Sequence, residues 1–259
     1  MNKKEIVEKF SLAGKEITLL TGKLAQQTDA AVTVKCGGTE VLATVVSSGP
    51  KEGSDYFPLY SEYIERLYAG GLIKGSRWVK REGRPSEEAI LNARMIDRSV
   101  RPLFPKDFMD QTQIVLTVLS VDHENDADML SAIAASAALH ISNLPWKGPI
   151  GVVRVGLREG SIFVNPTASE REGSDLDLVV TTSEDGVVML EGGAQEVSEE
   201  DFYGAVEFGK KHGEKVIEAI ESFREKAGEE KVAVKHEVTA EEKSIKQEAS
   251  KKASELVDQ

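Results

Sequence analysis

The sequence predicts an α+β fold, in which a mixed sheet rich in hairpins packs with helices. Val- and Thr-rich segments of strand length occur in pairs joined by short turns with glycine, which is typical of antiparallel hairpins. Amphipathic segments of helical length separate these pairs. The 259 residues are 40% hydrophobic and 29% charged, which suits a globular protein with a substantial core.

The first part of the chain predicts strands. Residues 17–25 form a first strand, 31–34 and 41–46 form a hairpin closed by two glycines, and 56–64 alternate apolar and polar residues as a half-buried strand does. The single cysteine, Cys36, precedes the glycine turn and has no partner for an intramolecular disulfide.

A loop rich in glycine and cations follows this strand. An exposed aromatic ring among cations suits single-stranded RNA, because bases stack on the ring while the cations hold phosphates. The alternative is that Trp78 packs on the domain or on another subunit, and the residues alone leave both open. The candidate RNA-binding residues are Arg77, Trp78, Lys80, Arg81 and Arg84.

A helix is predicted between Pro85 and Pro102. Pro85 suits a helix start, Ser86 is a capping residue, and Pro102 stops the helix. An apolar face is expected from Ile90, Ala93, Ile96 and Val100. Three arginines recur at positions i, i+4 and i+7 and line a neighbouring face, namely Arg94, Arg98 and Arg101.

Two explanations compete for these arginines. Asp97 lies three residues after Arg94 and four before Arg101, so an ordinary ladder of surface salt bridges accounts for two of them. Local charge favours a phosphate-rich partner, because residues 74–106 hold nine lysines and arginines against four acidic residues in a chain of net charge −12.

The second half predicts a buried strand at 113–121 and a small-residue helix capped by Asn125 or Asp126. His123, Asp126 and Asp128 cluster there, and we interpret them as capping and turn residues rather than metal ligands.

Two hairpins and two helices complete the prediction. The hairpins pair 150–157 with 161–164 and 176–182 with 186–190. A long amphipathic helix spans 198–223 and ends by Gly228, and a capping box at 239–242 starts a last, very polar helix that needs a partner.

Composition excludes several classes of protein. No apolar run is long enough to span a membrane and no secretory signal is present, so we expect a cytoplasmic protein without a membrane partner. Four scattered histidines and one cysteine exclude a structural zinc site. A pI near 5.0 makes any nucleic-acid contact local.

Four segments together resemble the N-terminal part of bacterial polynucleotide phosphorylases. They are Arg-Glu-Gly-Arg-Pro-Ser-Glu-Glu at 81–88, Arg-Met-Ile-Asp-Arg-Ser-Val-Arg-Pro-Leu-Phe-Pro at 94–105, Ala-Ala-Ser-Ala-Ala-Leu at 134–139 and Phe-Val-Asn-Pro-Thr at 163–167. The resemblance implies a first RNase PH-like domain at 1–227, its non-catalytic, RNA-binding copy. Residues 228–259 would then be a linker and the interrupted beginning of an all-helical domain.

The resemblance also implies a function for the parent enzyme. It degrades RNA from the 3′ end by attack of inorganic phosphate, releases nucleoside diphosphates, uses Mg²⁺, and forms a homotrimeric ring around an RNA channel, with partners in RNA-degradation complexes. Trp78 to Arg81 match the loop that grips RNA, with Val79 in place of a second aromatic. The three helix arginines match positions beside the phosphorolytic centre, with Ser99 in place of a proline.

The metal-binding aspartates of the family's catalytic copy are incomplete in this sequence. Ser169 stands at the first position and only Asp175 remains, so this chain is expected to hold no metal and to be inactive alone. One alternative is a stand-alone RNase PH-like exoribonuclease, with Asp175 and either Glu170 or Glu172 rebuilding a metal site. Two others are a non-catalytic RNA-binding scaffold, and a scaffold or small-molecule-binding relative that has lost RNA contact altogether.

Overall fold

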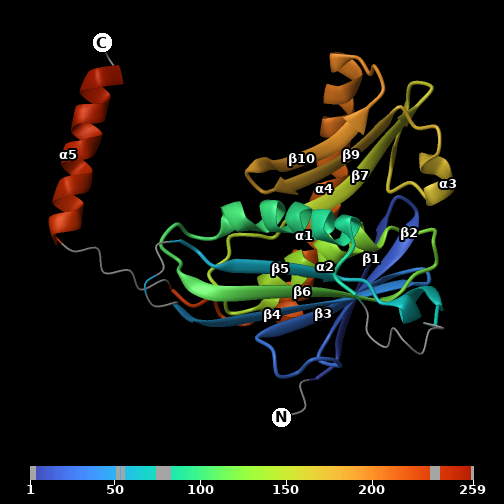
Figure 1. Cartoon of the computed structure of the whole chain (residues 1–259), viewed down its shortest axis with the longest axis horizontal. Coiled ribbons are helices and arrows are strands. Elements are labelled where there is room, and N and C mark those ends of the chain that lie inside the picture. The colour runs from blue at the N-terminus through green and yellow to red at the C-terminus, as the bar shows by residue number, and fades with distance from the viewer. Residues whose placement is uncertain (1–3, 51–52, 54–55, 74–82, 234–239, 258–259) are drawn as a thin grey trace.

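The computed structural model describes residues 4–50, 53, 56–73, 83–233 and 240–257, and its elements gather into two sheets with helices between and around them (Figure 1). The predicted α+β fold with hairpin-rich sheets is confirmed.

The first sheet has six strands in the order β1-β2-β3-β4-β6-β5. Its strands are β1 (Ile6–Leu12), β2 (Lys15–Thr21), β3 (Ala30–Cys36), β4 (Thr39–Pro50), β5 (Leu59–Ile64) and β6 (Asp110–Ser120). The predicted hairpin at the glycine turn is β3 and β4, with Val34 opposite Val41. Val41, Ala43 and Val45 are fully buried on one face of β4, so alternate residues of the central strands form the core.

Two features of this sheet were not predicted. Strand β1 alternates partly buried and exposed residues and pairs with β2 across a turn at Ala13 and Gly14, both with positive φ. Strand β5 pairs with β6 in parallel, whereas every other neighbouring pair in the sheet is antiparallel. A parallel pair needs a long crossover, and the chain between these strands holds helix α1 (Glu87–Val100).

The second sheet has four strands in the order β10-β9-β7-β8. They are β7 (Gly151–Arg158), β8 (Ser161–Val164), β9 (Leu176–Ser183) and β10 (Gly186–Ala194), and both predicted hairpins are present. The short helix α3 (Ala168–Arg171) connects β8 to β9.

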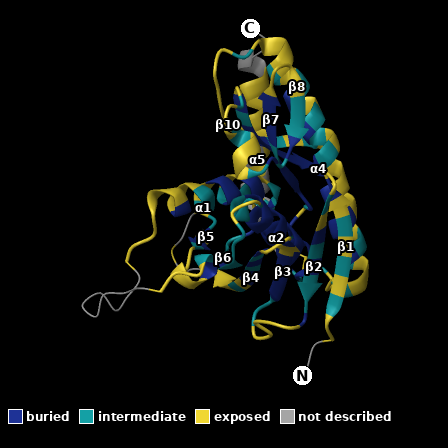
Figure 2. Ribbon diagram, turned by 90° about the vertical axis from the view of Figure 1, so that its right-hand side faces the viewer, coloured by how far each residue is buried: buried dark blue, intermediate teal, exposed yellow. Residues whose placement is uncertain are grey.

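Helix α2 (Ala127–Ile141) is the centre of the core. Every residue from Met129 to Ile141 is buried, and Figure 2 shows the helix in dark blue among the strands. Its small alanines and serines let neighbouring elements approach all round this helix. The hydroxyl of Ser136 donates to Ile150 O at 2.8 Å and accepts from Ile150 N at 2.9 Å, so this buried polar group is fully satisfied.

Helix α4 (Glu199–Ala227) covers the second sheet and begins at the predicted cap, where Ser198 Oγ accepts from Asp201 N at 3.1 Å. Two glycines allow the helix to approach the strands closely. A Cβ atom on Gly213 would lie 2.3 Å from Thr182 Oγ1, and one on Gly209 would lie 2.7 Å from Val180 Cγ2. A larger residue at either position would force the helix away from the sheet.

The chain after α4 returns to the end of α2. Glu229 N donates to Ile141 O at 2.8 Å, and Lys231 Nζ donates to the carbonyls of Leu139 and Ser142, both at 2.8 Å. Burial lowers the pKa of Lys231 to about 8. Helix α5 (Ala240–Val257) is drawn apart from the two sheets (Figure 1). In the part of the chain that the structure describes, no helix is both long and apolar enough to cross a membrane.

Candidate nucleic-acid interface

Helix α1 carries the predicted row of arginines and lies between β5 of the first sheet and β10 of the second (Figure 1). Its start follows the sequence, because Ser86 Oγ accepts from Ala89 N at 3.0 Å and Glu87 and Glu88 occupy the first turn. After Val100 the chain tightens into the short helix η2 (Arg101–Leu103) at Pro102.

The buried face of α1 differs from the predicted one. Ala89, Ile96 and Val100 are buried, but Ile90 is 49% exposed, so its assignment to the apolar face was wrong. The helix is turned so that Ser99 also faces inward, where its hydroxyl bonds Met95 O at 2.8 Å and lies 3.1 Å from Thr181 Oγ1 on β9. The serine therefore ties α1 to the second sheet.

Arg101 is held by the protein itself. Its Nε and Nη2 donate to the two carboxylate oxygens of Asp97 at 2.8 and 2.7 Å. The same guanidinium donates to the carbonyls of Phe57 and Leu59, each at 3.2 Å, and lies 5.7 Å from the centre of the Phe57 ring. Because the guanidinium is occupied by a bidentate ion pair and two carbonyls, the role of Arg101 is mainly structural. This agrees with the salt-bridge explanation for Arg101.

The other two arginines remain at the surface. Arg98 forms an ion pair with Glu191 of β10, which joins the helix to the second sheet and holds the guanidinium in place. Arg94 is exposed and forms no ion pair with any residue that the structure describes. Among the described residues, Arg101 is therefore held by several contacts, Arg98 is oriented by one ion pair, and Arg94 forms no ion pair.

Only part of the predicted RNA-binding loop lies within the described residues. Arg77, Trp78, Lys80 and Arg81 lie outside the described residues. Arg84 is exposed just before Pro85 and lines a groove at the start of α1.

An ion-pair cluster fills the space around the start of α2. The guanidinium of Arg154, on β7, reaches Asp126 at 3.0 Å, Asp128 at 2.5 Å and Asp177 at 2.7 Å. Arg171 of α3 pairs with Asp126 at 3.1 Å. Burial raises the pKa of Asp126, with a further contribution from Asp128, and Arg154 opposes this shift.

This cluster changes the interpretation of the predicted capping residues. Asp126 is the N-cap residue of α2 by position, but its side chain caps no backbone group and turns to the arginines instead. The sequence did not predict Arg154 or Asp177 as its partners. A signal was available, because an arginine inside a buried β-branched strand requires carboxylates nearby.

The described residues do not fit a magnesium site. Asp175 is exposed just before β9, and Ser169 lies on α3 with its hydroxyl 3.1 Å from that of Thr167. Glu170 accepts from the backbone and hydroxyl of Thr167 at 2.8 and 3.0 Å, bonds that lower its pKa. Among the residues described, no three His, Cys, Asp or Glu side chains are grouped to hold a metal ion, and the carboxylates that do converge are occupied by Arg154.

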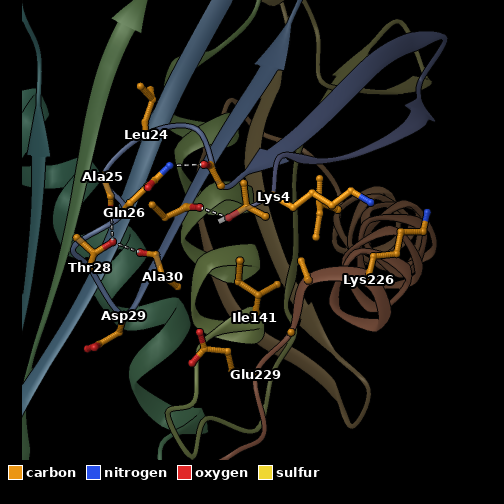
Figure 3. Close-up of a pocket in the computed structure, with 16 residues that line it drawn as sticks. Lys4, Leu24, Ala25, Gln26, Thr28, Asp29, Ala30, Ile141, Lys226 and Glu229 are labelled. Atoms are coloured by element: carbon orange, nitrogen blue, oxygen red, sulfur yellow. Dashed lines mark hydrogen bonds between the residues drawn. The ribbon is translucent and has the colours of Figure 1, made fainter. Parts of the chain in front are cut away.

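A separate cavity of about 260 Å³ lies between the loop that joins β2 to β3 and the end of α4 (Figure 3). Gln26 and Thr28 come from the loop after β2, Lys226 comes from the end of α4, and Glu229 follows that helix. None of the predicted site residues lines this cavity, so we do not assign the predicted function to it.

Comparison with solved structures defines the class of fold. A chain of the archaeal exosome core superposes with a TM-score of 0.60 at 17% identity, covering 85% of this chain and 87% of that one. A chain of the Archaeoglobus fulgidus exosome with RNA bound to the active site gives 0.61 at 18% identity, covering 83% and 87%. The two-sheet architecture is thus the RNase PH fold of exosome subunits.

Sequence comparison identifies the family. The 3′ exoribonuclease family models match this chain at residues 13–145 for domain 1 and 148–212 for domain 2. The chain belongs to the 3′ exoribonuclease family. The first match covers β2 to β6 with α1 and α2, and the second covers β7 to β10 with the first half of α4.

Curated relatives are longer than this chain. The polyribonucleotide nucleotidyltransferase of Desulfatibacillum aliphaticivorans is 48% identical over 225 residues, which cover 86% of this chain and 32% of the relative. That of Geobacter sulfurreducens is 49% identical over 216 residues, covering 83% and 31%. The predicted resemblance is confirmed, and the chain spans about a third of the length of these relatives.

Proposed function

We propose that this chain is the RNA-binding, non-catalytic RNase PH-like copy of a polyribonucleotide nucleotidyltransferase. The parent enzyme shortens RNA from its 3′ end with inorganic phosphate and releases nucleoside diphosphates. The identity to relatives of that name supports the proposal, as does the span of about a third of their length. In this proposal residues 1–227 form the RNase PH-like domain and residues 228–259 lead into a helical domain.

The single observation that carries the proposal is the contrast between the two charged regions. Phosphorolysis needs cations that gather phosphate and RNA, and carboxylates that hold a divalent metal against the transferring phosphoryl group. Arg94 and Arg98 supply surface cations on α1. The converging carboxylates around Arg154 are already neutralised by arginine. The chain therefore suits RNA and phosphate contact better than metal-dependent chemistry.

The resemblance also supports a proposal for the wider assembly. The parent enzyme acts as a cytoplasmic homotrimer with RNA in a central channel and with partners in RNA degradation. Its Mg²⁺ and inorganic phosphate are bound mainly by residues outside this chain, and Arg94 and Arg98 border the phosphate. Arg101 braces the end of the same helix through Asp97.

The test is RNA binding by the purified chain at several salt concentrations. Each phosphate contact adds about −0.7 to the slope of log K against log salt for a single strand, so Lys80→Ala with Arg81→Ala should weaken binding and reduce the slope by about 1.4. The matched control is Lys210→Ala with Lys211→Ala on α4, which removes two adjacent positive charges elsewhere. Equal losses in both double variants, or none in the first, would contradict the proposed role of the loop.

A further inference from the structure

We propose that a groove beside the start of α1 binds the base and ribose of one nucleotide of single-stranded RNA. The inference rests on the proposed function and adds a subsite formed by described residues alone. The groove has a volume of about 580 Å³, within the range of small-molecule sites in proteins. Its walls come from the chain around helix η1 (Leu67–Gly70) and from the turn that precedes α1.

Buried side chains form part of the lining of the groove. Tyr63 of β5 is 5% exposed and Ala89 of α1 is 3% exposed, and both line the groove. The two walls are joined by Ser86, whose hydroxyl donates to Glu65 Oε2 at 3.0 Å and accepts from Ala89 N at 3.0 Å. One side chain thus caps the helix and links it to the end of β5, so the shape exists before a ligand arrives.

The lining has both apolar and charged parts. Leu72 and Leu67 are 62% and 38% exposed, large values for leucine side chains at the edge of a groove. The charged members are two arginines and two glutamates, so their formal charges cancel, and they are Glu62, Glu65, Arg66 and Arg84.

This balance selects the kind of ligand. Bare phosphate is disfavoured, because two carboxylates line the groove and Glu87 and Glu88 already occupy the positive end of the α1 dipole. A nucleoside is neutral and fits better: its base has a flat face for leucine and guanidinium contacts, and its hydroxyl and amino groups donate to carboxylates. The groove therefore suits the base and ribose, whereas the cations of the predicted RNA-binding loop suit the phosphate.

The position of the groove supports the same ligand. Leu72 and Gly83 both line it, and they lie on either side of the segment that contains the predicted RNA-binding residues. In this proposal, a strand that binds the cations of this segment extends to the groove and places one base in it. Base contacts and phosphate contacts would then come from adjacent parts of the same surface.

The experiment compares single-stranded RNA affinity in the full chain carrying Leu72→Asn or Leu72→Met. Asparagine has the same branching and the same number of heavy side-chain atoms as leucine but replaces both methyl groups by polar atoms, so we expect affinity to fall roughly three- to tenfold. The methionine keeps apolar surface and should bind like the wild type. Neither variant should alter the slope of log K against log salt, because neither changes a charge. Leu24→Asn, at a leucine 39% exposed in the distant cavity, is the matched control.

The outcomes separate this inference from the proposed function. If Leu72→Asn binds RNA like the wild type while Lys80→Ala with Arg81→Ala binds weakly, the subsite is refuted and the proposed function stands. If neither weakens binding, both fail. An equal loss in Leu24→Asn, or a changed salt slope, refutes the subsite. So does a Leu72→Asn variant that changes only the oligomeric state, because the groove then contacts protein.

Discussion

Replacement of Arg154 by methionine should destabilise the fold strongly. Methionine keeps much of the aliphatic volume but removes the cation shared by three carboxylates. The Arg154 side chain is 11% exposed, and those of Asp126 and Asp128 are 17% and 14% exposed. Removing one partner of such a buried group costs about 3–5 kcal/mol of unfolding free energy. Asp177 is 43% exposed and contributes less. The melting temperature should fall by roughly 6–20 °C, since each kcal/mol shifts it by about 2–4 °C in a protein of this size.

The loss should depend on pH in a defined direction. The pKa of Asp126 is already raised by burial, and Arg154 limits that shift. Without Arg154 the folded-state pKa rises further above the unfolded value. Such a group stabilises the fold below its unfolded pKa, and this contribution is lost as pH rises through the folded pKa. The deficit of Arg154→Met should therefore be largest near neutral pH and shrink toward about pH 4.

Thermal unfolding of both proteins from neutral to acidic pH measures this prediction. The control is Arg158→Met, an exposed arginine on the same strand, which should change the unfolding free energy by about 0.5 kcal/mol or less. A melting temperature for Arg154→Met equal to that of the control, or a deficit that grows as pH falls, would refute the assigned role of the cluster.

Three further substitutions test separate parts of the account. Arg94→Ala should leave the melting temperature unchanged, because the side chain is exposed, while the salt slope of RNA binding falls by about 0.7. Trp146→Phe removes the 2.9 Å bond from Nε1 to the buried carbonyl of Val100, and should lower the urea-unfolding free energy by about 1–3 kcal/mol. Gly213→Ala should also destabilise, by about 1–3 kcal/mol, although alanine favours helices, because its Cβ would meet Thr182 Oγ1. A thermal melt that shows stabilisation would contradict the close approach of α4 to the sheet.

Local signals explain what the sequence predicted well. Gly37 has a φ of +58°, a conformation that favours glycine, so the amino-acid pattern is enough to locate the turn between β3 and β4. Ser86 and Ser198 both accept bonds from backbone amides at the predicted helix starts. Hairpins and caps depend on residues within a few positions of each other, so a single sequence is enough to predict them.

Contacts between distant segments explain the rest. Arg98 meets Glu191 across 93 residues, and Arg154 meets Asp128 across 26 residues. The spacing of residues along the sequence does not predict pairs that lie so far apart. The sequence likewise placed three arginines on one helix face but could not show that Arg101 would be bound by carbonyls of Phe57 and Leu59. These environments arise only when the two sheets and α1 come together.

The most direct test of the central proposal is an assay of RNA binding and phosphorolysis on one preparation of this chain. The chain is incubated with 3′-end-labelled single-stranded RNA, inorganic phosphate and Mg²⁺, and both bound RNA and released nucleoside diphosphate are measured. We predict salt-sensitive RNA binding without nucleoside diphosphate release. Phosphate-dependent release that is abolished by Asp175→Asn would contradict the account and assign catalysis to this chain.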